Sequence, residues 1–145
     1  LARLDFRQVV PSLCGKFHDA TAGRTPEVTL WGDGRQEREF LYIDDAADGI
    51  IAAALGPHCD LINIGSGECT SIHALAELIA KLTGYDGVVL FDESRYSGPQ
   101  RRWMSSARAQ ELLNWHATTS LRDGIARTLA DIKIRLADKP YEAQV

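Results

Sequence analysis

Apolar residues along the chain follow two different spacings. Helical spacing, with capping or terminating residues at several ends, predicts helices at about residues 9–21, 44–55, 72–82, 105–114 and 120–132. Short continuous apolar runs predict strands at residues 28–31, 40–43, 61–64 and 88–91. Because the two kinds of element alternate, the predicted fold class is α/β with some α+β character.

Residues 28–31 and 40–43 flank a Gly-Asp-Gly turn, which predicts a β-hairpin. In such a hairpin Trp31 and Arg38 lie near one another across the ladder. An indole beside a planar cation suits a nucleotide, with the base stacked on the ring and a phosphate held by the guanidinium. The alternative is structural: a half-buried Trp31 in a core and Arg38 in a surface ion pair.

Composition narrows the function classes. The 145 residues correspond to one domain, and a net charge of −4 argues against a nucleic-acid partner. Arg35, Arg38, Arg101 and Arg102 still offer local positive charge for a small anion. No apolar run reaches the ~18 residues that predict a membrane span. Three irregularly spaced cysteines fit neither a disulfide framework nor a zinc site, so we expect no metal and a cytoplasmic location.

Several segments together resemble a known family. They are residues 9–13, 17–22, 31–45, 62–67, 91–92 and 112–115. In order and spacing they resemble the C-terminal part of the extended short-chain dehydrogenases/reductases, which are NAD(P)-dependent nucleotide-sugar epimerases, dehydratases and reductases. Within that family the likeness is greatest to the GDP-L-fucose synthases. The resemblance implies the substrate-binding region of a Rossmann-like enzyme, with residues 1–138 as a single substrate-binding domain and 139–145 as a frayed tail.

Two hallmarks of the larger family are missing from this sequence. Residues 65–67, Gly-Ser-Gly, are too short for a dinucleotide-binding fingerprint, and no tyrosine is followed four residues later by lysine. The resemblance therefore implies that the chain holds no catalytic or cofactor-binding residue. NAD or NADP would bind in the full-length enzyme, and neither is expected to bind this chain alone. The implied partner is the missing N-terminal Rossmann domain.

Family roles transfer by position to five residues. The resemblance implies that Lys16 helps hold the nucleotide sugar, Trp31 meets the base, and Arg38 contacts the diphosphate. Arg102 would close on the substrate from a C-terminal loop, and Asp92 is a further substrate-binding candidate. Each has a structural alternative: a solvated lysine or arginine for Lys16 and Arg102, and a turn cap at a strand end for Asp92.

Three positions depart from the fucose synthases. Gln8 stands where they carry a histidine that assists epimerisation, and a neutral amide cannot donate and recover a proton. Ser105 replaces an aspartate. Asn114 replaces a glycine before Trp115, although asparagine can take the left-handed conformation that glycine supplies there.

The expected function is the nucleotide-sugar-binding portion of an NAD(P)-dependent epimerase/reductase of the GDP-L-fucose synthase type. The alternatives are part of a UDP- or dTDP-sugar epimerase/dehydratase and a non-catalytic sugar-nucleotide-binding module. In the family, residues 61–64 and the helix after Asp44 contact the dinucleotide domain. We therefore expect an exposed apolar surface and a homo-oligomer.

Overall fold

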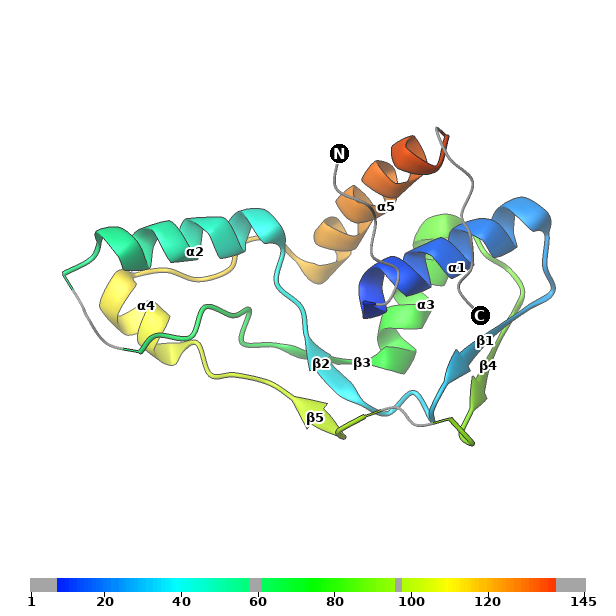
Figure 1. Cartoon of the computed structure of the whole chain (residues 1–145), viewed down its shortest axis with the longest axis horizontal. Coiled ribbons are helices and arrows are strands. Elements are labelled where there is room, and N and C mark those ends of the chain that lie inside the picture. Colours follow the sequence, from blue (N-terminus) through cyan, green and yellow to red (C-terminus); the bar gives the residue numbers. More distant parts are fainter. Residues whose placement is uncertain (1–7, 58–60, 96–97, 138–145) are drawn as a thin grey trace. The chain divides into compact units, whose positions relative to one another are not determined.

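The computed structural model describes residues 8–57, 61–95 and 98–137, and it divides into two compact units. The first unit comprises residues up to 34, residues 73–97 and the chain from 125 onward, and the second comprises residues 35–72 and 98–124. The elements of each unit are labelled in Figure 1. The chain passes repeatedly from one unit to the other, so each unit is assembled from segments that are distant in sequence.

The first unit holds the apolar core. It contains helices α1 (Val9–Gly23), α3 (Ile72–Thr83) and α5 (Leu121–Ala137) for all or most of their lengths. Strands β1 (Glu27–Trp31) and β4 (Val88–Asp92) form a parallel pair. Helical spacing on α1, α3 and α5 and alternate positions on β1 supply the buried side chains: Leu13, Cys14, Phe17, Ala20, Val28, Leu30, Leu75, Ala76, Ile79, Ile125, Leu129 and Ile132.

The second unit is built from two helices and a small mixed sheet. Its helices are α2 (Ile43–Leu55) and α4 (Ala107–Leu113). In its sheet, β2 (Glu37–Glu39) lies between β3 (Cys69–Ser71), which runs antiparallel to it, and β5 (Arg101–Arg102), which runs parallel. Among the described residues of this unit, Ala109 is the one fully buried apolar side chain.

The predicted hairpin is wrong. β1 pairs with β4, and β2 belongs to a different sheet, so Trp31 and Arg38 do not face one another across a ladder. The second strand also begins earlier than predicted, at Glu37 rather than residue 40. Its three polar residues are each half-buried between two neighbouring strands, a situation that local β-propensity does not register.

Two further strand predictions are corrected. Residues 61–64 form no strand, although they were predicted as one from their apolar run. β3 was not predicted, and β5 lies at the end of the segment expected to be a loop. These strands are two or three residues long and exist only because β2 supplies their hydrogen bonds, so their own sequence carries little signal.

The helix predictions and the fold class are confirmed, with one correction at an end. Asn114 takes the left-handed conformation after α4 (φ 48°), and Ser120 and Asp123 bond reciprocally at the start of α5. The helix predicted to begin at Asp44 begins one residue earlier, at Ile43, and its N-cap position is Tyr42. Residues 139–145 lie outside the described part of the chain. No helix in the described ranges is long and apolar enough to cross a bilayer.

Candidate functional site

Two arginines from distant parts of the sequence are neighbours in the sheet of the second unit. Arg38 on β2 is in register with Arg102 on β5, and Glu37 is in register with Arg101 beside them. Residues directly opposite one another on adjacent strands project to the same face of a sheet, so the two guanidinium groups share a face. Like charges in that arrangement repel, and an anion bound between them relieves the repulsion.

The neighbouring pair on the same strands is electrically balanced. Arg101 Nε lies 3.1 Å from Glu37 Oε2. The pKa of Arg101 is raised first by its interaction with the Cys69 side chain and then by the Glu37 carboxylate. Arg38 Nη1 donates a 2.8 Å hydrogen bond to the carbonyl oxygen of Glu37, which orients its guanidinium plane. Arg38 and Arg102 lie beside this ion pair on the same two strands.

A cleft of about 570 Å³, within the range of small-ligand sites, opens beside Arg101 and Arg102 of β5. Its lining combines two arginines with apolar and aromatic side chains and one carboxylate: Glu39, Leu41, Ile64, Gly65, Arg101, Arg102, Trp103 and Met104. All of these residues belong to the second unit. A cation-rich wall next to an apolar wall suits a ligand that carries both an anionic group and a ring.

Trp103 is the aromatic residue of this cleft. Its indole Nε1–H donates to the Gly67 carbonyl oxygen at 3.1 Å, and the Arg101 guanidinium carbon lies 5.5 Å from the ring centroid. The side chain remains 48% exposed, so much of its surface is open to a ligand. Sequence reasoning missed both Trp103 and Glu39. The signal that could have identified them is their position in the sequence, since Trp103 directly follows Arg102 and Glu39 directly follows Arg38.

Trp31 and Asp92 lie together in the first unit, at the ends of the paired strands β1 and β4. Trp31 is 61% exposed, which rules out the core role considered for it, and Arg95 lies over its ring. Asp92 Oδ1 accepts hydrogen bonds from the Ser94 hydroxyl (2.6 Å) and amide (3.1 Å). Those bonds, with the nearby Arg95, hold the pKa of Asp92 below its ordinary value.

Lys16 also lies in the first unit, on α1. Its Nζ donates a 3.2 Å hydrogen bond to the Thr29 carbonyl oxygen, and partial burial lowers its pKa. The five predicted site residues thus divide between the units: Lys16, Trp31 and Asp92 in the first, Arg38 and Arg102 in the second. A substrate-binding role for each of them stays a prediction.

No three histidine, cysteine, aspartate or glutamate side chains of the described ranges gather closely enough to hold a metal ion. Cys14 is buried in the core of the first unit, and burial raises the pKa of its thiol to about 12. A thiol with that pKa is protonated at neutral pH and is a poor nucleophile or ligand.

Comparison with known proteins places these features in a family. Residues 4–65 match the profile described as "NAD dependent epimerase/dehydratase family". The chain is 39% identical over 130 residues to GDP-L-fucose synthase of Escherichia coli K12, covering 83% of this chain and 40% of that protein. The chain is thus similar to the NAD dependent epimerase/dehydratase family over residues 4–65 and to a GDP-L-fucose synthase over 130 residues. Its likeness to GDP-L-fucose synthases, expected from the motifs, is confirmed.

Solved structures of the family share this fold. UDP-glucose 4-epimerase of Thermotoga maritima, determined with UDP-glucose, matches 89% of this chain and 40% of its own length with a TM-score of 0.77 at 26% identity. GDP-mannoheptose C4 reductase of Campylobacter jejuni, with NADP bound, matches 87% of this chain and 45% of its own with a TM-score of 0.76 at 28% identity. The chain spans about two fifths of the length of these relatives.

Proposed function

We propose that this chain is the nucleotide-sugar-binding portion of an NAD(P)-dependent epimerase/reductase of the GDP-L-fucose synthase type. The observation that carries the proposal is the in-register pair Arg38–Arg102, of which Arg102 lines a ligand-sized cleft. Two forked cations on one face match the charge of a diphosphate, and each can bind it through two hydrogen bonds. The 39% identity to a GDP-L-fucose synthase supports GDP as the nucleotide.

Cofactor binding and catalysis are assigned to the part of the enzyme outside this chain. Relatives bind NAD or NADP as full-length proteins, and this sequence has neither the Gly-rich fingerprint nor the Tyr-x-x-x-Lys pair. We expect the chain alone to be inactive and to bind neither dinucleotide. Gln8 weakens the case for fucose synthase chemistry in the strict sense, because an amide cannot replace an acid–base histidine.

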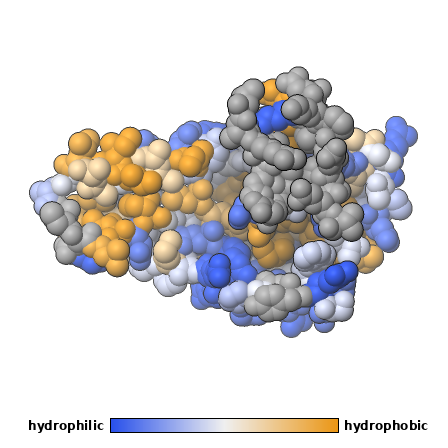
Figure 2. Space-filling model, in the orientation of Figure 1, coloured by the Kyte–Doolittle hydropathy of each residue, from blue (hydrophilic) through white to orange (hydrophobic). Residues whose placement is uncertain are grey.

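The exposed face of α2 is the proposed contact with that missing part. α2 leaves Ile43, Ile50, Ile51 and Leu55 exposed, and Leu61 beyond it is 84% exposed. Figure 2 shows these hydrophobic residues gathered over the α2 end of the second unit. A contiguous apolar patch of this kind is typical of an interface. More than half of each relative's length lies outside the region that matches this chain, and we propose that the corresponding part of the enzyme covers the patch.

A UDP-sugar epimerase is the alternative function. It is favoured by the match to the UDP-glucose 4-epimerase of Thermotoga maritima and by 33% identity over 105 residues to a Bacillus subtilis protein described as a UDP-glucose epimerase. Parallel titrations of the chain with GDP-L-fucose and UDP-glucose separate the two functions. The proposal expects GDP-L-fucose to bind more tightly.

Titration calorimetry of the chain with GDP-L-fucose tests the role of the arginine pair. A charged bidentate contact contributes about 1.5–3 kcal/mol, so Arg38→Ala should weaken binding about 10- to 150-fold. Arg38→Lys should retain little of the lost affinity, because an ammonium group cannot form the two parallel hydrogen bonds of a planar guanidinium. Arg122→Ala, which removes an exposed arginine elsewhere in the second unit, is the matched control. Unchanged affinity in Arg38→Ala would contradict the proposal.

A further inference from the structure

The carboxylate of Glu39 joins three segments of the second unit. Its Oε1 accepts a 2.8 Å hydrogen bond from the Gly67 amide and lies 3.4 Å from the Ser66 hydroxyl, while Oε2 accepts a 3.0 Å bond from the Met104 amide. Glu39 itself sits on β2, next to Arg38. The Glu39 side chain therefore ties β2 to the Gly-Ser-Gly loop (residues 65–67) and to the chain that follows β5. We call Glu39 and the groups hydrogen-bonded to it the clasp.

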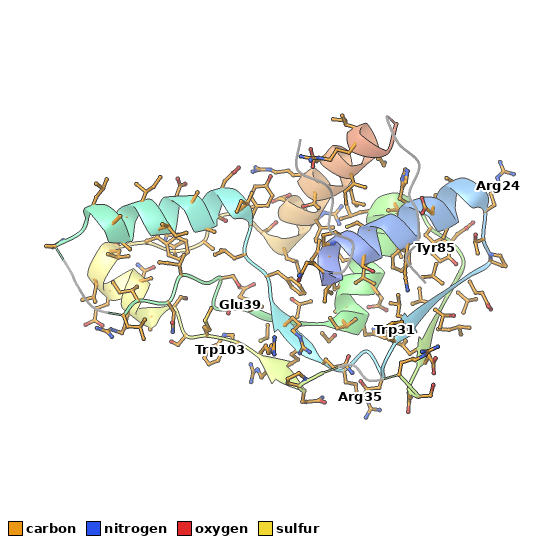
Figure 3. All side chains as sticks on the ribbon, viewed as in Figure 1. Arg24, Trp31, Arg35, Glu39, Tyr85 and Trp103 are labelled. Atoms are coloured by element: carbon orange, nitrogen blue, oxygen red, sulfur yellow. The ribbon has the colours of Figure 1, made fainter. Side chains whose placement is uncertain are left out.

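The loop and the strand are also joined to each other. Trp103, which is labelled with Glu39 in Figure 3, donates its indole N–H to the Gly67 carbonyl. Gly67 is therefore held by its amide and by its oxygen. Gly65 is packed directly against the Glu39 carboxylate, where a Cβ atom would overlap Oε1. The glycine-rich loop, too short to bind a dinucleotide, is instead shaped to receive this carboxylate.

We propose that Glu39 is a positioning residue that holds the Trp103–Met104 wall of the cleft in place for the ligand. Glu39, Gly65, Trp103 and Met104 line the cleft, and Gly67 is hydrogen-bonded to Glu39 and Trp103. Hydrogen bonds to a charged acceptor are stronger than neutral ones, so the carboxylate can fix two backbone segments that have no regular secondary structure. The same bonds turn its negative charge toward backbone amides. The identity of the ligand rests on the proposed function.

The clasp is tested first without ligand, in the 145-residue chain. Glu39→Gln preserves the size of the side chain but leaves one acceptor oxygen for two backbone donors, so the Gly67 or Met104 amide loses its partner. We expect its hydrogen exchange to accelerate about tenfold, the equivalent of 1.4 kcal/mol, and the Trp103 Nε1–H resonance to shift. Trp115, in the same unit, is the internal reference, and Glu111→Gln is the matched control because Glu111 is exposed on α4.

The second arm measures GDP affinity of the same variants by calorimetry. Glu39→Gln should weaken GDP binding about tenfold, by the same free-energy conversion, while Glu111→Gln leaves it unchanged. If the wild-type chain does not bind GDP, the proposed function fails, and the exchange measurements still decide the role of Glu39. Unchanged exchange at Gly67 and Met104 with an unshifted Trp103 signal overturns the positioning role. So does a shift shared equally by Trp103 and Trp115, which indicates general loss of stability.

Discussion

Asp45 is the buried charge whose removal has the most clearly defined structural cost. It lies in the first turn of α2, only 5% exposed, and its oxygens accept a 3.0 Å hydrogen bond from the Thr118 hydroxyl and a 2.9 Å bond from the Thr119 amide. Asp45→Asn leaves a single acceptor for these two donors. Because a hydrogen bond to a charged group contributes about 1.5–3 kcal/mol, the unfolding free energy should fall by about that amount.

Asp44→Asn is the matched control, since Asp44 is exposed in the same first turn. Both substitutions remove a negative charge from the positive end of the helix dipole, so that contribution, about 0.3–1 kcal/mol, is common to both. Urea denaturation of the two variants at pH 7, monitored by tryptophan fluorescence, isolates the Thr118 and Thr119 bonds as the difference. A difference below about 0.5 kcal/mol, the usual limit for surface substitutions, would refute the reasoning.

The same carboxylate predicts a pH dependence with a definite sign. Burial raises the pKa of Asp45, but the hydrogen bonds from Thr119 and Thr118 outweigh burial and hold it below its ordinary value. A depressed pKa in the folded state gives stability that is fully present above the unfolded pKa of about 3.9 and is lost as pH falls through the folded value. Asp45→Asn should therefore flatten the acid limb of the stability curve.

Three further predictions address the first unit, the apolar surface and the cofactor. Gly34 has φ +73°, and a Cβ atom there would lie 2.5 Å from Phe91 Cε1, whereas Gly84 has φ +74° and open space around it. In urea denaturation, Gly34→Ala should therefore lower the unfolding free energy about 1–2 kcal/mol more than Gly84→Ala does. Equal losses in the two variants would contradict the predicted clash with Phe91. Because Ile50 and Leu55 are exposed, the chain should self-associate in sedimentation, and replacing both with aspartate should give a monomer; a monomeric wild-type chain at high concentration would contradict this. Titration calorimetry of the chain with NADP should show no binding, and one-to-one binding at low micromolar affinity would contradict this prediction.

The sequence was sufficient for the helices and the core of the first unit. Helical spacing of large apolar residues along α3, with Gly84 after it, marks both a buried face and an end, and the structure buries Leu75 and Ile79 there. Such signals are local, because each helix satisfies its own backbone hydrogen bonds. The left-handed Asn114 after α4 is another feature read from a single residue type at a helix end.

The small sheet of the second unit could not be predicted in the same way. β2, β3 and β5 are short and polar, and each depends on hydrogen bonds to residues that are 30 or more positions away in the sequence. The Arg38–Arg102 register follows from that pairing and not from spacing along the chain. Family resemblance named both arginines, but their adjacency, and the clasp around Glu39, required the tertiary structure.

The central claim is that Arg38 and Arg102 together bind a diphosphate. Its most direct test compares the affinities of GDP and GMP for the wild-type chain and for the chain carrying both Arg38→Ala and Arg102→Ala. Two guanidinium forks on one face should give the wild type at least a tenfold preference for GDP, since a single charged hydrogen bond contributes about 1.5 kcal/mol or more. The double variant should bind the two nucleotides with equal affinity. A preference for GDP that survives loss of both arginines would contradict the account.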